Sequence, residues 1–230
     1  MSEKPLFDQY SDSYDSNLNH ALAATGEDKE YFARGRVAWL SRCLSEMHVQ
    51  PKLAMDYGCG IGSTVPVLWE TLKLEEIVAV DVSGRSLATA REKHNFSAVR
   101  YAGIEEYRPQ GTLDLVYCNG VFHHIPKAER PAAFAYVRES LKPGGFFAFW
   151  ENNPWSPATR YVMSRCAFDK DAQMLSVSEA KIRLKDSGFA ILSCDFLFVF
   201  PRFLKPLQST EPILRKLPVG AQYQILARKS

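Results

Sequence analysis

Residues 53–64 read Leu53-Ala54-Met55-Asp56-Tyr57-Gly58-Cys59-Gly60-Ile61-Gly62-Ser63-Thr64, and this stretch decides the fold. A short apolar run leads to an acid, Asp56, and a loop follows with glycine at every second position. Val65, Leu68 and Leu72 then recur at helical spacing. The pattern predicts a buried parallel strand, a tight turn and a helix. Because glycine permits positive φ and a helix start offers free N–H groups, the loop suits a polar ligand with negative character.

Size and composition narrow the class of protein. A length of 230 residues predicts one domain, and a net charge of +2 is too small to indicate a nucleic-acid partner. The cysteines are odd in number and lack C-x-x-C spacing, which argues against a disulfide framework or a zinc site: Cys43, Cys59, Cys118, Cys166 and Cys194. The N-terminus shows no secretory pattern and no apolar run is long enough to span a bilayer, so we expect a cytoplasmic protein without a transmembrane segment.

A second acid follows a second apolar run. Ile77-Val78-Ala79-Val80 leads into Asp81 and Val82, about twenty residues after the glycine loop. In nucleoside-binding α/β folds an acid at this place accepts hydrogen bonds from ribose hydroxyls, because a carboxylate can take two at once. The alternative is a helix N-cap or turn acid. The spacing favours the ribose role for Asp81.

The glycine pattern separates two classes of cofactor. A dinucleotide fold has G-x-G-x-x-G, whereas here Ser63 stands at the position of the third glycine. D-x-G-x-G-x-G resembles motif I of the class I S-adenosylmethionine-dependent methyltransferases. The resemblance implies that the glycines lie against the methionine part of the cofactor and that the first acid helps to hold its amino group. The implied cofactor-binding residues are Asp56, Gly58, Gly60, Gly62, Asp81 and Val82.

The N-terminal segment resembles a second feature of the family. Phe7-Asp8-Gln9-Tyr10 and Tyr14-Asp15 fit the F-D-x-Y-x-x-x-Y-D pattern with which many small-molecule methyltransferases begin. In those enzymes the segment folds over the cofactor as a lid. The resemblance implies that Tyr10 and Tyr14 contact the methionine end of the cofactor. The alternative for so short a polar segment is a surface lead-in to the helix expected from about residue 27 to residue 47.

The fourth strand leads to a pair of histidines. Leu113 to Cys118 runs into Asn119-Gly120-Val121-Phe122-His123-His124-Ile125, which resembles methyltransferase motif IV. The resemblance places Asn119 at the cofactor, and Phe122 and His123 at the acceptor. We expect His123 or His124 to remove a proton from a nucleophilic hydroxyl, a role that suits an imidazole. Each could instead be a structural histidine or a pocket wall. We expect no metal, because adjacent residues on a regular element diverge and no acid–histidine pattern is visible.

The third strand departs from the family pattern at its end. After residues 99–101, Gly103-Ile104 occupies the place where the family often has an acid that reads the adenine amino group. We expect Ile104 to pack on the adenine face while its backbone or Glu105 reads the adenine edge.

The fifth strand, Phe146 to Glu151, follows the turn Leu141-Lys142-Pro143-Gly144-Gly145, in which we expect glycine to cap the preceding helix. Residues 152–176 depart from regular alternation, and we expect them to form a substrate wall with Glu151, Asn152 and Trp155; the alternative is an ordinary crossover loop. Asn152-Asn153-Pro154-Trp155 is in the wrong place for the base-gripping box of DNA amino-methyltransferases, so we reject base methylation.

Taken together, the motifs predict an α/β, Rossmann-like, doubly wound seven-stranded sheet in the order 3-2-1-4-5-7-6. The last strand, residues 222–227, is antiparallel, and residues 189–200 form the sixth. We expect one methyltransferase domain with a lid and helix (1–50), a cofactor-binding core (51–151) and substrate-side and C-terminal strands (152–230). The aromatic and basic residues of 196–207 favour core and a dimer surface; the alternative is a seat for a lipid-linked substrate, with weak contact to a membrane surface. Monomer and homodimer both stay open.

The predicted activity is methyl transfer from S-adenosylmethionine to oxygen of a small-molecule or lipid- or sugar-linked acceptor, with S-adenosylhomocysteine as product. The nucleoside-binding fold follows from the residues, and the methyl transfer follows from the resemblance. Three alternatives from other classes stay open, of which a nucleic-acid methyltransferase is disfavoured by the modest charge and the absence of basic tracts. The other two differ in their reaction or their cofactor. One is a non-catalytic module that binds S-adenosylmethionine, and the other is a nicotinamide-dependent oxidoreductase, against which Ser63 and the lid pattern argue.

Overall fold

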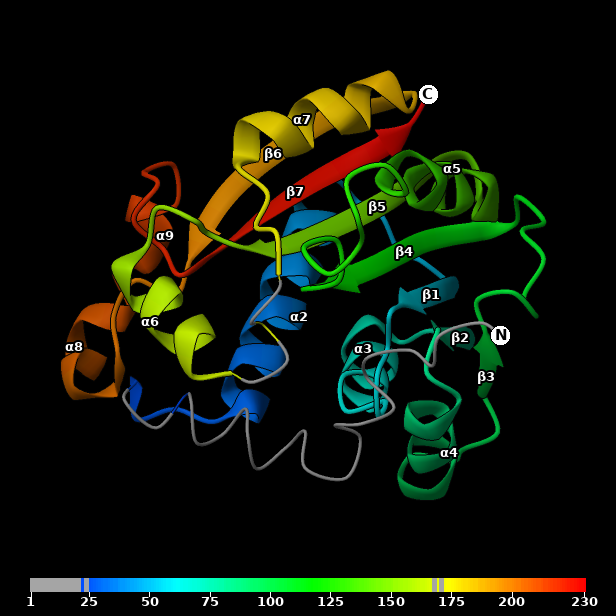
Figure 1. Ribbon diagram of the computed structural model, residues 1–230, viewed down its shortest axis with the longest axis horizontal. Coiled ribbons are helices and arrows are strands. Elements are labelled where there is room, and N and C mark those ends of the chain that lie inside the picture. The colour runs from blue at the N-terminus through cyan, green and yellow to red at the C-terminus, as the bar shows by residue number, and fades with distance from the viewer. Residues whose placement is uncertain (1–21, 23–24, 167–168, 170–171) are drawn as a thin grey trace.

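The computed structural model describes residues 22, 25–166, 169 and 172–230. The expected roles of Tyr10 and Tyr14 fall outside these residues. The described residues form a sheet of seven strands in the order β3-β2-β1-β4-β5-β7-β6, with β7 antiparallel to both of its neighbours (Figure 1). The expected strand order and the antiparallel last strand are therefore confirmed.

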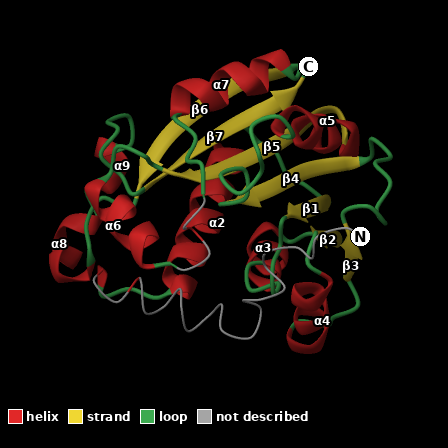
Figure 2. Cartoon of the chain, in the orientation of Figure 1, coloured by secondary structure: helices red, strands yellow, loops and turns green. Residues whose placement is uncertain are grey.

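Strands and helices alternate through the first half of the chain (Figure 2). The strands are β1 (Leu53–Tyr57), β2 (Glu76–Asp81), β3 (Val99–Gly103), β4 (Leu113–Asn119), β5 (Leu141–Asn152), β6 (Phe189–Leu197) and β7 (Gln222–Lys229). The longer helices are α2 (Lys29–Glu46), α3 (Val65–Leu72), α4 (Gly84–Lys93), α5 (Arg130–Ser140), α6 (Pro157–Arg165) and α7 (Val177–Asp186). Three short turns of helix lie between β6 and β7, namely η4 (Arg202–Leu204), α8 (Lys205–Gln208) and α9 (Glu211–Leu214).

The central strands are buried because helices cover both faces of the sheet. On one face, apolar side chains of α2 and α3 pack against β1, β2 and β4. On the other face, side chains of α5 and α7 pack against β4, β5 and β7. Such two-sided burial explains why β1, β2 and β4 are nearly continuous apolar runs rather than alternating ones. The strand order reverses between β1 and β4, which lie side by side in the sheet. In open α/β sheets, ligands bind at such a point of reversal, outside the carboxyl ends of the strands.

The turn before β5 differs from the expectation. We expected glycine to cap α5, but the helix ends at Ser140 and Leu141 is already extended and paired with Leu113. Gly144, at φ +74°, lies inside a bulge, since the register next resumes at Leu115 and Phe146. The prediction of a glycine cap is therefore wrong. The physical reason is that Leu141 is fully buried and joins the ladder at once.

Two further boundaries differ from the expectation. The sixth strand ends at Leu197, because Phe198 adopts a left-handed φ of +62°. The stretch 152–176 contains α6, whose Thr159 hydroxyl donates to the Ala221 carbonyl at 2.6 Å, next to the start of β7. Asn153 Nδ2 donates nearby to the Gly220 carbonyl at 2.7 Å. These bonds fix α6 beside the sheet. None of the described helices is long and apolar enough to cross a membrane.

Candidate functional site

The glycine loop joins the end of β1 to the start of α3. Gly58, Gly60 and Gly62 have positive φ, at +75°, +53° and +77°. The amides of Gly58 and Cys59 both donate to the Val80 carbonyl, at 2.8 and 3.0 Å, which ties the loop to the end of β2. A Cβ placed on Gly60 would meet no heavy atom of the described residues within 4 Å beyond its chain neighbours. Gly60 therefore presents bare backbone to open space, which lets a ligand approach closely.

Asp81 ends β2 and holds the loop from the other side. Its Oδ2 accepts the Gly60 amide at 2.8 Å, and its Oδ1 accepts the Ser83 amide at 2.8 Å. The Ser83 hydroxyl in turn accepts the Ser86 amide at 3.0 Å and caps α4. A carboxylate offers about four acceptor sites. Asp81 can therefore anchor the backbone and serve hydroxyl groups of a ligand together.

A second acid and an arginine lie behind the loop. Asp56 is buried, and burial together with the charge of Asp81 raises the pKa of Asp56 to about 7, while Arg36 opposes the shift. Arg36 comes from α2; its Nε donates to the Tyr117 hydroxyl at 3.0 Å and its Nη1 to Gln222 Oε1 at 3.0 Å. Arg36 also borders the cavity described next. The loop end of the site thus holds two acids and one guanidinium.

Sequence reasoning missed Arg36, although a signal was present. Arg36 shares the helical face of Leu40 and Leu44, both of which are buried in the core. Arginine is almost never buried without partners. An arginine on the apolar face of α2 therefore marks a polar site at the end of the sheet that this face covers.

A cavity of about 490 Å³ connects the glycine loop to the histidine pair. This volume lies within the range of small-molecule and cofactor sites. Its loop side is lined by Gly58, Gly60, Asp81, Val82, Ile104 and Asn119. Its far side is lined by His123, His124, Glu129, Asn152 and Asp169, together with Ala158, Val162 and Met163 of α6. The two sets of residues therefore face the same space.

His123 is oriented by a buried carboxylate. Its Nδ1 lies 2.6 Å from Glu151 Oε2, and Glu151 Oε1 accepts the amides of Phe122 at 2.8 Å and His123 at 3.3 Å. Glu151 is fully buried at the end of β5, the neighbour of β4 in the sheet. The pairing of β4 with β5 thus places the Glu151 carboxylate against Nδ1 of His123 and fixes the orientation of the ring. Glu151 does not itself line the cavity.

Asp169 joins the two histidines from the segment after α6. Its Oδ1 lies 3.5 Å from His123 Nε2 and 3.3 Å from His124 Nε2. Burial lowers the pKa of His123, but Glu151 and Asp169 outweigh it and raise this pKa to about 10. Burial lowers the pKa of His124, with the charge of His123 adding to the effect and Asp169 opposing it. The sequence showed no acid–histidine pattern because Asp169 reaches the pair only through the tertiary fold.

The histidines do not diverge as adjacent residues on a regular element would. They lie in the turn after β4, with ring centroids 4.1 Å apart. Of the two grounds for expecting no metal, the divergence of adjacent residues is wrong, since the turn brings the rings together; the absence of an acid–histidine pattern holds for the sequence, but the fold brings Asp169 to the pair.

A family model described as a methyltransferase domain matches residues 54–145, from the first strand through the glycine loop and the histidine pair. Over these residues the chain carries a methyltransferase domain, which supports a class I S-adenosylmethionine-dependent methyltransferase. The resemblance inferred from the motifs is thereby confirmed.

Relatives of this methyltransferase family cover different shares of the chain. Trans-aconitate 2-methyltransferase of Escherichia coli O1:K1 / APEC is 26% identical over 116 residues, which are 50% of this chain and 45% of that protein. Malonyl-[acyl-carrier protein] O-methyltransferase 2 of Coxiella burnetii is 23% identical over 195 residues, or 82% and 74% of the two chains. A crystal structure of a methyltransferase from Thermotoga maritima matches with a TM-score of 0.65 at 18% identity, over 97% and 98% of the two chains. The chain spans about half the length of the trans-aconitate relatives that it matches.

The loop side of the cavity fits S-adenosylmethionine, the cofactor of this methyltransferase family. Among the described residues, Asn119 Oδ1 is a buried acceptor without a hydrogen-bond partner, and Asn119 borders the cavity. The ammonium group of the cofactor is a donor that could satisfy it. The bare backbone of Gly60 and the carboxylate of Asp81 lie on the same side. These residues suit a ligand that carries an amino group and ribose hydroxyls.

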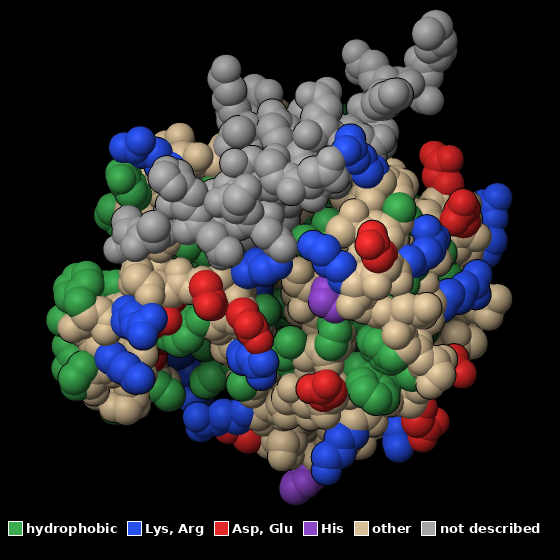
Figure 3. Space-filling model, turned by 90° about the horizontal axis from the view of Figure 1, so that it is seen from below, with side chains coloured by type: hydrophobic (Ala, Val, Ile, Leu, Met, Phe, Trp, Pro, Cys, Tyr) green, Lys and Arg blue, Asp and Glu red, His purple; other side chains and the backbone are tan. Residues whose placement is uncertain are grey.

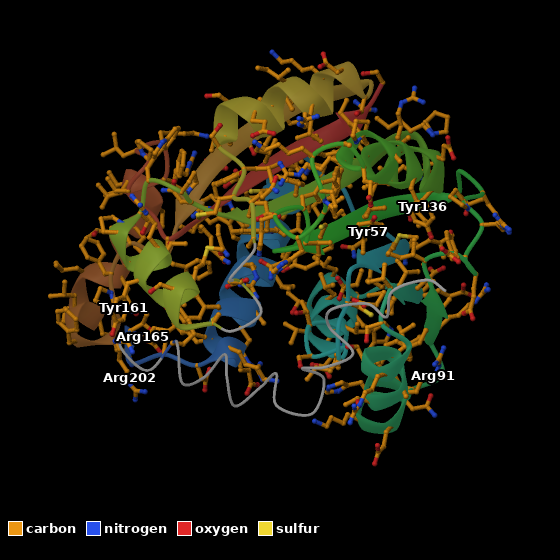
Figure 4. The ribbon with its side chains drawn as sticks, in the orientation of Figure 1. Tyr57, Arg91, Tyr136, Tyr161, Arg165 and Arg202 are labelled. Atoms are coloured by element: carbon orange, nitrogen blue, oxygen red, sulfur yellow. The ribbon has the colours of Figure 1, made fainter. Side chains whose placement is uncertain are left out.

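Ile104 borders the cavity, but its backbone is engaged. Its amide donates to the Asp81 carbonyl at 3.1 Å, and its carbonyl accepts the Tyr136 hydroxyl at 3.1 Å. Tyr136 lies beside Tyr57, with ring centroids 5.7 Å apart (Figure 4). Glu105 is exposed and does not line the cavity. The structure therefore leaves the side chain of Ile104 for contact with adenine and does not support an edge reading by its backbone or by Glu105.

Four other expected site residues do not line the cavity, and one of them is Asp56, which is buried behind the glycine loop. Phe122 is fully buried and packs on Phe134 and Phe149, so its position does not support contact with a substrate. Trp155 is 54% exposed at the surface and does not line the cavity. A Cβ on Gly62 would meet Ala90 and Tyr101 at 3.0 Å, so this glycine permits packing of the loop on α4 and β3. Val82, Asn119 and Asn152 do border the cavity.

The glycines of the loop are expected to respond differently to a methyl group. Gly60→Ala places its Cβ in open cavity space, so the protein should fold with a small loss of stability, roughly 1 kcal/mol for the left-handed backbone, and lose cofactor affinity about tenfold or more. In Gly58→Ala the Cβ would collide with the side chain of Val121, so this variant should lose stability first. Thermal melting and calorimetric titration separate the two. Equal cofactor affinity in Gly60→Ala and the unchanged protein would show that the ligand does not approach this backbone.

Proposed function

We propose that this protein transfers a methyl group from S-adenosylmethionine to an oxygen atom of a small-molecule acceptor. The observation that carries the proposal is the shared cavity, which has the glycine loop and Asp81 on one side and His123 and His124 on the other. A cofactor seated on the loop and an acceptor seated at the histidines would meet in one enclosed space. Methyl transfer requires the acceptor oxygen to approach the methyl carbon in line with the sulfur–carbon bond that breaks, with water kept out.

On the cofactor side, each residue matches one part of the ligand. The carboxylate of Asp81 would accept the ribose hydroxyls, and Val82 and Ile104 would flank the adenine. Asn119 would accept from the amino group. Arg36 would face the carboxylate of the methionine part, since its guanidinium borders the cavity at the loop end. Hydrogen bonds to charged groups are the strong ones in such a site.

On the acceptor side, α6 supplies an apolar wall and the histidines supply polar groups. Ala158, Val162 and Met163 face Asn152, His123 and His124 across the cavity. This composition suits a small acceptor with an apolar body and an oxygen function. The Coxiella relative is an O-methyltransferase, which agrees with oxygen as the atom that is methylated.

When bound, the cofactor supplies an activated methyl group on its sulfonium. The chain aligns the acceptor oxygen, excludes water through the wall of α6, and provides the Nε2 of His124, whose pKa is lowered by burial, where the acceptor proton is received; His123, whose pKa is raised, is already protonated near neutral pH. Glu151 holds the His123 ring in place during this step. Positioning and proton removal are the contributions that the residues of this cavity can make.

Cofactor affinity is expected to rise with pH through about 7. Asp56 has a pKa of about 7 in the ligand-free protein because burial and Asp81 disfavour its charge. A cofactor with a positive net charge favours the ionised carboxylate, so binding below this pKa must release a proton and should weaken by up to tenfold per pH unit. Titration calorimetry at pH 6, 7 and 8 measures the slope. Asp56→Asn should flatten the part of the slope that belongs to Asp56, and an unchanged slope in this variant would contradict the assignment.

The test of the proposed function has two stages. Purified protein should bind S-adenosylmethionine and S-adenosylhomocysteine with micromolar affinity and should fail to bind a nicotinamide dinucleotide. A panel of hydroxy and carboxylic acids with a labelled methyl donor should then reveal an acceptor. Binding of both cofactor forms without transfer to any acceptor would favour a non-catalytic binding module. Failure to bind either form, in protein shown to be folded, would remove the basis of the proposal.

The distribution of charged side chains on the surface favours a small-molecule acceptor over a polyanion such as a nucleic acid. Figure 3 shows Lys and Arg side chains dispersed among Asp and Glu on the face that it presents. The net charge of the chain is +2. Nucleic-acid binding requires several phosphate contacts from clustered basic residues. We therefore propose a small-molecule acceptor and no nucleic-acid partner, and a cytoplasmic site of action remains a prediction.

A further inference from the structure

The cluster at the far side of the cavity has the composition of a metal centre. One ring nitrogen of His123, one ring nitrogen of His124 and a carboxylate oxygen of Asp169 lie within 4.8 Å of one another. The three side chains come from two segments, the turn after β4 and the stretch after α6. Two imidazoles and one carboxylate are the donor set of many catalytic sites for divalent transition metals, in which further positions stay open for water or substrate.

The distances within the cluster also fit ligands arranged around a shared ion. A charge-assisted hydrogen bond between nitrogen and oxygen is about 2.7–2.9 Å long. Asp169 Oδ1 lies 3.5 and 3.3 Å from the two Nε2 atoms. Ligands at about 2.0–2.1 Å from a tetrahedral ion lie about 3.3 Å from one another. Both contacts match this edge length, and one oxygen faces both nitrogens, as it would around a shared ion.

A second observation is the support behind His123. Histidine ligands commonly donate their other ring nitrogen to a carboxylate, which fixes the tautomer and the orientation of the ring. Glu151 Oε2 lies 2.6 Å from His123 Nδ1, and two backbone amides hold Glu151 in turn. His123 Nε2 is thereby directed at Asp169. The two carboxylates, Glu151 and Asp169, also balance the charge of a divalent cation in a buried place.

We propose that His123, His124 and Asp169 bind one divalent transition-metal ion of the Zn²⁺ type, with Glu151 as the partner that orients His123. All three ligands border the cavity, so the open position of the ion faces the acceptor. The consequence for catalysis rests on the proposed methyl transfer. An acceptor hydroxyl that binds the ion loses its proton to solvent more readily, and the metal then takes the place of a histidine base.

The test uses the full chain after dialysis against a chelator. Titration with Zn²⁺, and with Co²⁺ followed by visible absorption, should show one ion per chain at micromolar affinity or tighter. Asp169→Asn keeps the side-chain shape and should weaken binding at least about 100-fold, as should His124→Asn. The matched control is His48→Asn, since His48 is exposed at the end of α2 and Asn tolerates its left-handed φ of +57°. Circular dichroism establishes that each variant folds.

Two results would overturn the metal site. One is the absence of saturable binding at one ion per chain, and the other is equal affinity in Asp169→Asn and the unchanged protein. In either case the cluster is an ion pair that fastens the segment after α6. Titration of the same metal-free protein with S-adenosylhomocysteine keeps the two proposals apart. If the protein binds the cofactor but no metal, only the proposed metal site is refuted. If it binds metal but not the cofactor, the proposed methyl transfer is refuted.

Discussion

Asp81→Ala is expected to weaken binding of S-adenosylmethionine and S-adenosylhomocysteine about 100-fold or more while the protein still folds. Hydrogen bonds to a charged group are worth about 1.5–3 kcal/mol each, so two ribose hydroxyls on one carboxylate account for a loss of this size. The change also releases the amides of Gly60 and Ser83, so a moderate fall in melting temperature should accompany it. Calorimetric titration with both ligands measures the effect.

The matched control is Asp114→Ala. Asp114 also accepts two backbone amides, those of Lys52 at 2.7 Å and Leu53 at 2.9 Å, but it lies near the amino-terminal end of β4, whereas Asp81 lies at the carboxyl end of β2. This variant should lose a similar amount of stability and keep its cofactor affinity. If Asp81→Ala binds both ligands as the unchanged protein does, the ribose assignment fails.

Replacing a histidine of the pair is expected to lower the rate of methyl transfer about 10²–10⁴-fold with cofactor affinity kept within about twofold. A positioned acid or base contributes a factor of this size, and loss of a metal ligand at the acceptor has a comparable consequence. His124→Asn is the cleaner variant, because His123→Ala leaves Glu151 buried without its partner and should also destabilise the fold. Single-turnover rates with a labelled donor measure the loss once an acceptor is known.

Chelation distinguishes the two roles of the pair. If a histidine is the base, chelator-treated protein should keep its rate; if the pair holds an ion, the rate should fall and return when Zn²⁺ is added. His48→Asn serves again as the control, with rate and affinity unchanged. Full activity in both His123→Ala and His124→Asn would mean that the acceptor needs neither a base nor an ion from this pair.

Much of the fold could be read from local patterns. The run from Leu53 to Asp56, the glycines after it and the acid at Asp81 are each recognisable because strand burial and positive φ depend on neighbours in the sequence. Their order along the chain then implied the sheet, since parallel strands joined by helices allow few topologies. The glycine turn at Gly144 was misread because its geometry depends on where Leu141 pairs in the sheet.

The residues of the site also fall into two groups, those that the sequence predicts and those that only the tertiary structure brings together. By itself the sequence determined the glycine loop, the acid that follows the second strand and the position of the histidine pair after the fourth, because each is fixed by residues a few positions apart. Only the tertiary structure decided that Glu151 stands behind His123, that Asp169 reaches both histidines, and that Arg36 from α2 borders the same cavity. The physical reason is that these contacts join segments far apart in the chain, and packing of the sheet and of α6 brings them within a few ångströms.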